Sequence, residues 1–210
     1  MSQLFDGKDT FNEDLSGWDT SSVMSMQQLF RGAASFNTDL SSWNVSSVAS
    51  MKGMFRDSGF NGDISSWKIS SVTPIGSYPE SWRRSGMGFM FYGALFNQDI
   101  SSWDVSSVIS MGYVFCGSGF NSDISSWNVS SVMSMRSMFG GTPFNHTLAN
   151  GMYQVLQTWG GCSVIQASIL TSVLVMYQVS LPRGVCLILL HSMVTLATGI
   201  YHPSLTREIC

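Results

Sequence analysis

FNTDLSSWNVSSVASM, residues 36–51, is the stretch that decides the fold, because near copies of it recur along the chain. The shared pattern is F-N-x-D-[LI]-S-x-W-x-[TVI]-S-S-V, and units begin at Phe11, Phe36, Phe60, Phe96, Phe120 and Phe144. The starts lie 25, 24, 36, 24 and 24 residues apart, and a Met-rich segment such as SMQQLFRGAAS completes each unit. One unit cannot bury its own apolar face, whereas stacked units bury a continuous core. The repeat therefore predicts a solenoid with one coil for each 24–25 residues.

The two halves of the unit predict different secondary structure. In DLSSWNVSSV, Trp43 and Val45 share one face of an extended chain, and residues of these types favour strands. In the Met-rich half, Ser25 is a candidate N-cap and Gln28 completes a capping box. The apolar residues that follow at helical spacing are Met26, Leu29, Phe30 and Ala33, and the glycines that suit helix ends are Gly32, Gly93 and Gly117. We therefore expect an α/β, leucine-rich-repeat-like solenoid with one short strand and one short helix in each coil.

Charge divides the chain into two regions. Residues 1–148 hold 20 of the 23 charged side chains, and residues 149–182 hold none. We expect a repeat solenoid over 1–148 and an apolar, irregular or non-native tail over 149–210. The third unit is about 12 residues too long, and removing PIGSYPESWRR (74–84) would restore its length. This insertion is either a projecting loop or retained non-coding sequence, and both interpretations stay open.

The tail has lost the repeat pattern but keeps its period. MYQV occurs at 152 and again at 176, and Cys162, Cys186 and Cys210 are also 24 residues apart. A displaced reading frame explains this, because the repeat continues in the underlying DNA; read in a shifted frame, NGMYQV can encode WDVSS. We expect the frame to change near His146. The alternative is that the apolar span 163–201 anchors the solenoid to a membrane.

The start of the chain also falls inside a unit. MSQLFDGKDTF (1–11) aligns without a gap on MQQLFRGAASF (26–36). We therefore expect the chain to be a fragment of a longer protein with further repeats.

Two polar columns should run along the stacked coils. The asparagines are Asn12, Asn37, Asn61, Asn97 and Asn121, and the aspartates are Asp14, Asp39, Asp63, Asp99 and Asp123. A ladder of carboxylates could hold Ca²⁺, which takes several oxygen ligands. The interpretation we favour is that both residue types bond backbone groups in recurring turns.

A tryptophan column allows a similar choice. Its members are Trp18, Trp43, Trp67, Trp103 and Trp127. Exposed rings in a row could stack on sugars, whereas one large ring per coil is more often core. We favour the core, and assign the pairs Met54–Phe55, Met90–Phe91 and Met138–Phe139 to it as well.

No motif indicates catalysis or a cofactor. The three histidines lie at 146, 191 and 202, so the complete repeats carry no His base or metal ligand. Phosphate-binding, nucleophile-elbow and zinc-ligand motifs are missing from the sequence. Charged residues make up only 11% of the chain and the net charge is −3, which argues against a nucleic-acid partner. Cys116 is interpreted as a small apolar substitute.

The repeat resembles that of BspA-like leucine-rich-repeat surface proteins, whose pattern is D-[IL]-S-x-W-[DN]-[VT]-S-x-V-x-x-M-x-x-M-F. The resemblance covers residues 1–148. It implies a non-enzymatic solenoid at the cell surface or secreted, although no signal peptide is visible, and a role in adhesion or partner binding. We therefore expect a protein or surface ligand. The alternative is a glycan- or calcium-binding module that uses the Trp or Asp column.

Overall fold

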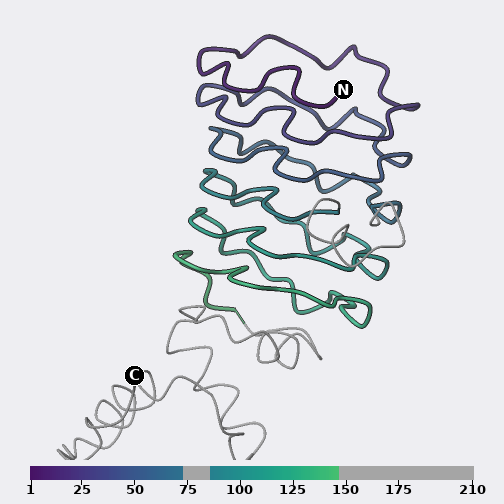
Figure 1. Cartoon of the computed structure of the whole chain (residues 1–210), viewed down its shortest axis with the longest axis vertical. Helices are drawn as coiled ribbons and strands as arrows, with labels where there is room; N and C mark the ends of the chain where they lie inside the picture. Colours follow the sequence, from purple (N-terminus) through teal and green to yellow (C-terminus); the bar gives the residue numbers. More distant parts are fainter. Residues whose placement is uncertain (73–85, 147–210) are drawn as a thin grey trace, which may run out of the picture.

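The chain forms a stack of flat coils that lie one below another along the long axis of the molecule (Figure 1). The computed structural model describes residues 1–72 and 86–146. Within these residues there is no helix and no extended strand. The only β-type pairings in the described part are isolated parallel bridges, Ser25 with Ser50, Ser50 with Gly86 and Ser110 with Ser134.

The predicted α/β solenoid with a helix in each coil is therefore wrong. The Met-rich half of each unit is a run of tight turns, whose described copies are residues 1–10, 26–35, 51–59, 87–95, 111–119 and 135–143. In the second copy the amide groups of Leu29, Arg31 and Ala33 donate to the carbonyls three residues before them, at 3.1–3.3 Å. An α-helix needs bonds to the fourth residue before, so Ser25 and Gln28 form no capping box here.

Left-handed backbone conformations explain how these turns succeed one another. Gln28 has a φ of 52° and Gly32 a φ of 70°, each at the third residue of a turn. A positive φ at that place is what a type II turn requires. Along the turns, two side chains therefore point outward, the next two inward and the next two outward again. Met26, Leu29, Phe30 and Ala33 are buried as a result, at the same spacing as the buried face of an amphipathic helix.

Backbone hydrogen bonds join the turn segments of successive coils. The amide groups of Met26, Gln28 and Phe30 donate to the carbonyls of Ser50, Lys52 and Met54 in the next coil, at 2.9 Å each. Alternate amides therefore bond within the turn and between coils, and both kinds of donor find a partner. The same alternation recurs at the later junctions.

In the other half of the unit, side chains make most of the bonds between coils. This half, called the Trp half here, comprises residues 11–25, 36–50, 60–72, 96–110, 120–134 and the start of a further copy at 144–146. Each of the first five copies closes two turns within itself; in the second, Trp43 donates its amide to the Leu40 carbonyl, and Val48 donates its amide to the Val45 carbonyl. Asn, Ser and Trp side chains supply the contacts to the neighbouring coil, as described below.

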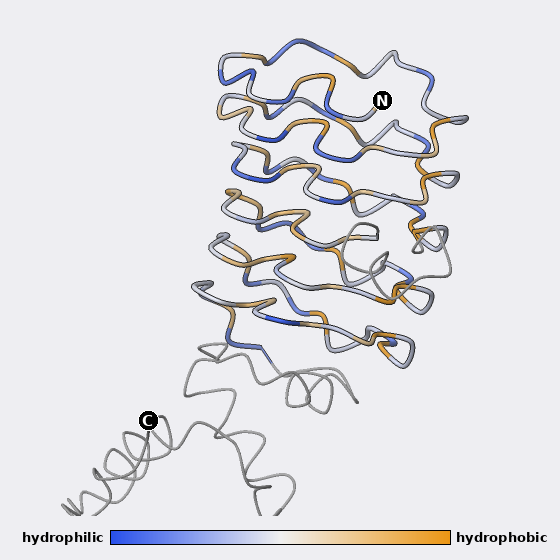
Figure 2. Ribbon diagram, viewed as in Figure 1, coloured by the Kyte–Doolittle hydropathy of each residue, from blue (hydrophilic) through white to orange (hydrophobic). Residues whose placement is uncertain are grey.

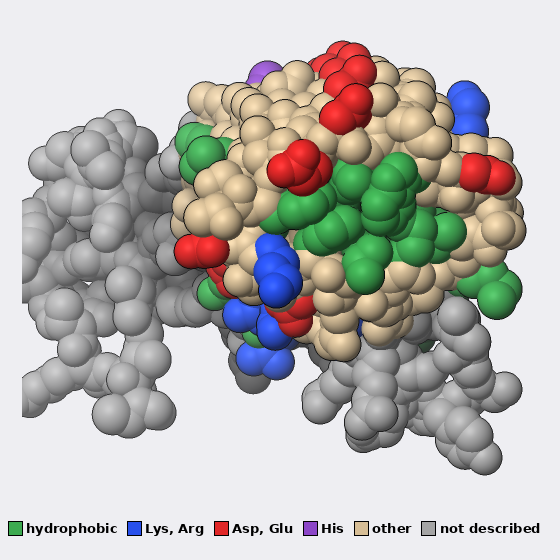
Figure 3. All heavy atoms as spheres, turned by 90° about the horizontal axis from the view of Figure 1, so that it is seen from above, with side chains coloured by type: hydrophobic (Ala, Val, Ile, Leu, Met, Phe, Trp, Pro, Cys, Tyr) green, Lys and Arg blue, Asp and Glu red, His purple; other side chains and the backbone are tan. Residues whose placement is uncertain are grey.

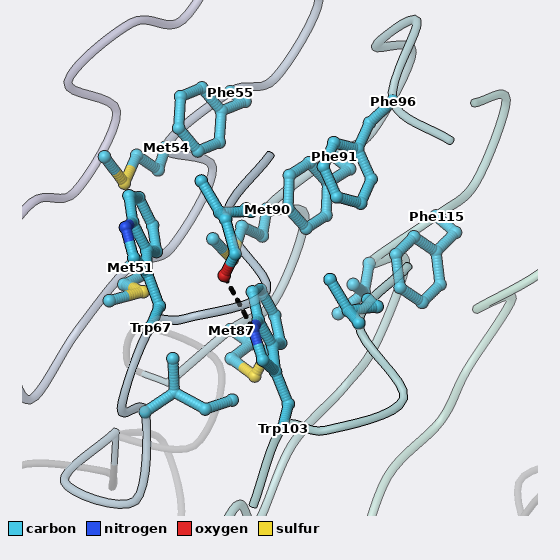
Figure 4. Packing of buried hydrophobic residues seen from close by; sticks show 14 of the residues in the cluster. Met51, Met54, Phe55, Trp67, Met87, Met90, Phe91, Phe96, Trp103 and Phe115 are labelled. Atoms are coloured by element: carbon cyan, nitrogen blue, oxygen red, sulfur yellow. Dashed lines mark hydrogen bonds between the residues drawn. The ribbon is translucent and has the colours of Figure 1, made fainter. Parts of the chain in front are cut away.

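The core is a double column of phenylalanine rings inside the stack (Figure 4). One column holds Phe5, Phe30, Phe55, Phe91, Phe115 and Phe139, and the other holds Phe11, Phe36, Phe60, Phe96, Phe120 and Phe144. Centroids are 5.4–6.3 Å apart along each column and 3.8–4.2 Å apart between partners in one coil. The methionine pairs predicted as core pack beside these rings and are buried. Figure 2 shows hydrophobic positions recurring at the same place in successive coils.

The predicted insertion at 74–84 and the predicted tail at 149–210 lie outside the described residues, as does the proposed anchor at 163–201. Among residues 1–72 and 86–146, the structure contains no helix long and apolar enough to cross a membrane.

Candidate functional site

The asparagine column bonds one coil to the next. The Oδ1 atom of Asn12 accepts the amide N–H of Asn37 at 2.8 Å, and Asn37 does the same for Asn61. Asn61, Asn97 and Asn121 continue the ladder as far as Asn145. Each amide oxygen is thus committed to a backbone donor, and the column performs a structural task.

The aspartate column closes turns within each coil. Asp39 Oδ1 accepts the backbone N–H of Ser41 at 2.8 Å, and Asp14, Asp63, Asp99 and Asp123 accept the equivalent bond at 2.8–2.9 Å. Such bonds favour the ionised carboxylate, so the amide and hydroxyl of the following serine lower the pKa of Asp14, Asp39, Asp99 and Asp123. Nowhere in residues 1–72 and 86–146 do three metal-binding side chains gather closely enough to hold an ion.

These lowered pKa values predict a loss of stability in acid. A carboxylate whose pKa is lower in the folded chain than its unfolded value of 3.8 stabilises the fold above that value. The stabilisation is lost as the pH falls through the lower folded pKa. We expect the melting temperature to hold steady from pH 7 to pH 5 and to fall below about pH 4. An Asp39→Asn variant, which keeps the oxygen acceptor, should show a smaller fall in melting temperature in acid than the unmodified chain. A fall as large in the variant as in the unmodified chain would contradict this assignment.

The tryptophan column is mostly buried and hydrogen-bonded. Trp43, Trp67, Trp103 and Trp127 are each 3% exposed. Each indole Nε1–H donates to a backbone carbonyl of the preceding coil, at 2.9–3.1 Å. These four rings offer no face on which a sugar could stack. Trp18, in the first coil, is 41% exposed.

The outward positions of the turn segments form a surface that sequence reasoning missed. We call this surface the turn face, and define it by four positions in each coil. Its members are residues 2, 3, 6 and 7; 27, 28, 31 and 32; 52, 53, 56 and 57; 88, 89, 92 and 93; 112, 113, 116 and 117; and 136, 137, 140 and 141. Every residue of this set other than glycine is at least partly exposed.

Residue identity changes from coil to coil on the turn face, as it does at some exposed positions of the Trp half. The Asn, Asp and Trp columns keep one residue type in every complete unit. The Asn and Trp side chains bond neighbouring coils, and the Asp side chains close turns within each coil. On the turn face, by contrast, the second position reads Gln3, Gln28, Gly53, Phe89, Tyr113, Ser137, and the third reads Asp6, Arg31, Arg56, Tyr92, Cys116, Gly140. Stacking leaves the side chains of these two columns free to differ, so their chemistry changes along the stack.

Aromatic and basic side chains meet in the middle of the turn face. The rings of Phe89 and Tyr113 stack with centroids 4.7 Å apart. The Arg56 guanidinium lies 4.9 Å from the centre of the Tyr92 ring and 5.8 Å from that of Phe89. Lys52 and Arg136 approach Phe89 and Tyr113 at 6.0 and 5.9 Å. We call these six residues the aromatic–basic cluster. Aromatic residues and arginine are the types enriched in binding hot spots.

The backbone under this cluster is strained. Phe89 and Tyr113 both have a φ of 61°, a conformation that costs an L-residue about 1–2 kcal/mol. The column accepts smaller residues, since Gly53 and Ser137 have φ values of 59° and 49°. Bulky rings at such positions are rare, and strained residues concentrate at functional sites. Aligning the repeat units in the sequence reveals that these columns vary. It does not reveal that the rings stack or that the backbone beneath them is strained.

The comparison with protein families gives one match. The model of "Mycoplasma protein of unknown function, DUF285" matches residues 1–84 and, as a second tandem copy, residues 79–162. No curated protein and no solved structure matches the chain.

Proposed function

The chain belongs to the Mycoplasma protein family of unknown function DUF285, and we propose that it is a non-enzymatic repeat solenoid that binds a protein through its turn face. The observation that carries the proposal is the aromatic–basic cluster: two partly exposed rings on strained backbone, flanked by three cations.

Protein binding suits this cluster better than catalysis. Its titratable groups are lysine, arginine and tyrosine, and it holds no histidine, so it lacks an acid–base pair suited to neutral pH. Arg56 is already paired with Asp57 at 3.0 Å, which fixes the guanidinium over the rings. A rigid, preorganised aromatic surface loses little entropy on binding. A location at the cell surface is part of the same proposal, supported by the resemblance of the repeat to BspA-like surface proteins.

The proposal predicts that the cluster is needed for binding and is not needed for folding. Phe89→Ser combined with Tyr113→Ser should weaken binding at least tenfold, because each removed ring is worth more than about 1 kcal/mol at a hot spot. Serine is chosen because Ser137 occupies the same column at a φ of 49°. The measurement is binding of the full chain to an array of purified extracellular proteins, with an oligosaccharide array beside it.

The matched control is Leu95→Ser, which removes a side chain that is 67% exposed and lies outside the turn face. It should bind as the unmodified chain does. Binding confined to oligosaccharides would contradict the proposal, as would equal protein binding by the double variant.

A further inference from the structure

Charge is divided unequally between the two halves of the coil. Over their described copies the Trp halves hold eight carboxylates, since Glu13, Asp19 and Asp104 join the Asp column, and a single lysine, Lys68. The turn face holds four cations and two carboxylates. Seen along the stack axis, most Lys and Arg side chains gather at one edge of the molecule, and a group of Asp and Glu side chains lies at another edge (Figure 3). A chain with a net charge of −3 therefore carries a basic turn face beside acidic Trp halves.

The positive charge of the turn face exceeds what its own carboxylates neutralise. Asp6 accepts two hydrogen bonds from Arg31 at 2.7 Å, and Asp57 accepts one from Arg56 at 3.0 Å. These are the two ion pairs of the described part of the chain, and the exposed Arg136 belongs to neither. A partner that covers this face is therefore favoured if it supplies negative charge.

The aromatic–basic cluster has a definite order along the stack. Its cations lie at the two ends, because Lys52 and Arg56 come from the turn segment 51–59 and Arg136 comes from 135–143. Its three rings lie in the two coils between them, whose turn segments contain no charged residue. Backbone hydrogen bonds join these coils, which sets neighbouring segments about 4.8 Å apart and the two ends of the cluster about 14 Å apart. An extended peptide covers that distance in about four or five residues.

This order selects the occupant. A carboxylate at each end would pair with the cations there, and apolar side chains between the two would pack on the rings. A sulfated oligosaccharide instead carries negative charge along its length, and would set anions over ring faces that are themselves partly negative. We propose, building on the function proposed above, that the turn face binds an extended segment of a partner protein in which two acidic side chains, about four or five residues apart, flank apolar ones.

The test measures binding of the full chain to three sets of synthetic peptides by fluorescence anisotropy of a dye on each peptide. The sets share the same apolar central residues, and the flanking residues are Asp or Glu in the first set, Lys or Arg in the second, and Ser or Asn in the third. We expect saturable binding of acidic peptides, at least tenfold tighter than that of the other sets and weakened by added salt. Equal binding of acidic and neutral peptides would overturn the inference, and so would tighter binding of a sulfated oligosaccharide.

A pair of charge reversals locates the site. Arg136→Glu reverses the cation at one end of the cluster, and should weaken the acidic peptides at least tenfold, which corresponds to about 1.4 kcal/mol. Lys68→Glu changes the net charge of the chain by the same amount in the Trp half, and should leave the affinity unchanged. Both side chains are exposed, so neither change should prevent folding. Equal affinities for the two variants would overturn the assignment to the turn face.

The ring variant, Phe89→Ser combined with Tyr113→Ser, distinguishes failure of this inference from failure of the proposed function. Peptide binding that needs the rings but does not depend on the flanking charge would overturn the acidic segment and leave the turn face as a protein-binding surface. Peptide binding that the ring variant leaves unchanged would contradict both. Absence of saturable binding to any peptide would overturn the inference, whereas the protein array decides the proposed function separately.

Discussion

Phe91→Ala should lower the free energy of unfolding by about 3–5 kcal/mol, the largest effect we expect of a single substitution. Phe91 is 0% exposed and contacts rings on every side. It stacks on Phe55 and Phe115 in the adjacent coils at 5.6 and 5.7 Å, and on Phe96 in its own coil at 3.9 Å. The stability of a solenoid is a sum of coil and junction contributions. Removing this ring weakens two junctions at once and leaves a cavity between them.

The measurement is chemical denaturation of the full chain, with Phe89→Ala as the matched control. Phe89 lies two residues earlier, is partly exposed and belongs to the turn face rather than to the phenylalanine columns. Its substitution should cost less than about 1 kcal/mol, as surface changes usually do. Equal losses for the two variants would show that Phe91 does not occupy a packed core.

Trp103→Phe should cost about 1–3 kcal/mol, the second largest effect. The indole Nε1–H of Trp103 donates to the backbone carbonyl of Ile64 at 3.1 Å in the coil above (Figure 4). Phenylalanine keeps part of the apolar ring but removes one of the two donors of that buried oxygen, which still accepts the Trp67 amide at 3.1 Å. The cost is the net contribution of one hydrogen bond, about 0.5–1.5 kcal/mol, together with the cavity left by the smaller ring.

Trp18→Phe provides the comparison, because Trp18 is 41% exposed in the first coil. Its unfolding free energy should stay within about 0.5 kcal/mol of the unmodified chain. Denaturation curves followed by circular dichroism avoid the change in tryptophan fluorescence. A Trp103→Phe variant as stable as Trp18→Phe would contradict the role given to the indole bond.

The sequence was sufficient to identify which residues recur and to suggest what the polar columns do. An aspartate two residues before a serine predicts a side-chain bond to that serine's amide, and the five aspartates of the column all make it. A tryptophan in every coil predicts burial, which holds for four of the five. These features depend on local chemistry and on the repeat itself.

The backbone of the Met-rich half could not be predicted in the same way. A turn segment that alternates two outward and two inward residues buries Met26, Leu29, Phe30 and Ala33, which is also the pattern of a helix face. The contrary signal was glycine at 53, 88 and 112, in the middle of the predicted helices, where it is unfavourable. The amides that would bond along a helix bond instead to the next coil, and only tertiary stacking supplies those partners.

The turn face was missed for a related reason. On a predicted helix, Phe89 and Tyr92 would be ordinary surface residues. Phe89 and Tyr113 belong to different units, and nothing in the sequence indicates that their rings touch. Stacking in register places the two rings 4.7 Å apart. The cluster follows from the coil geometry, so it could be found only after that geometry was known.

The most direct test of the turn-based coil is the stability of Gly53→Ala. Gly53 has a φ of 59°, and a Cβ atom there would meet only the Gln28 and Arg56 side chains, at ordinary contact distances of 3.5 and 3.8 Å. The variant therefore reports backbone conformation with little steric contribution. The turn structure predicts a loss of about 1 kcal/mol in unfolding free energy, because alanine resists the left-handed region. A gain of about 0.5–1 kcal/mol, as alanine gives in the interior of a helix, would contradict it.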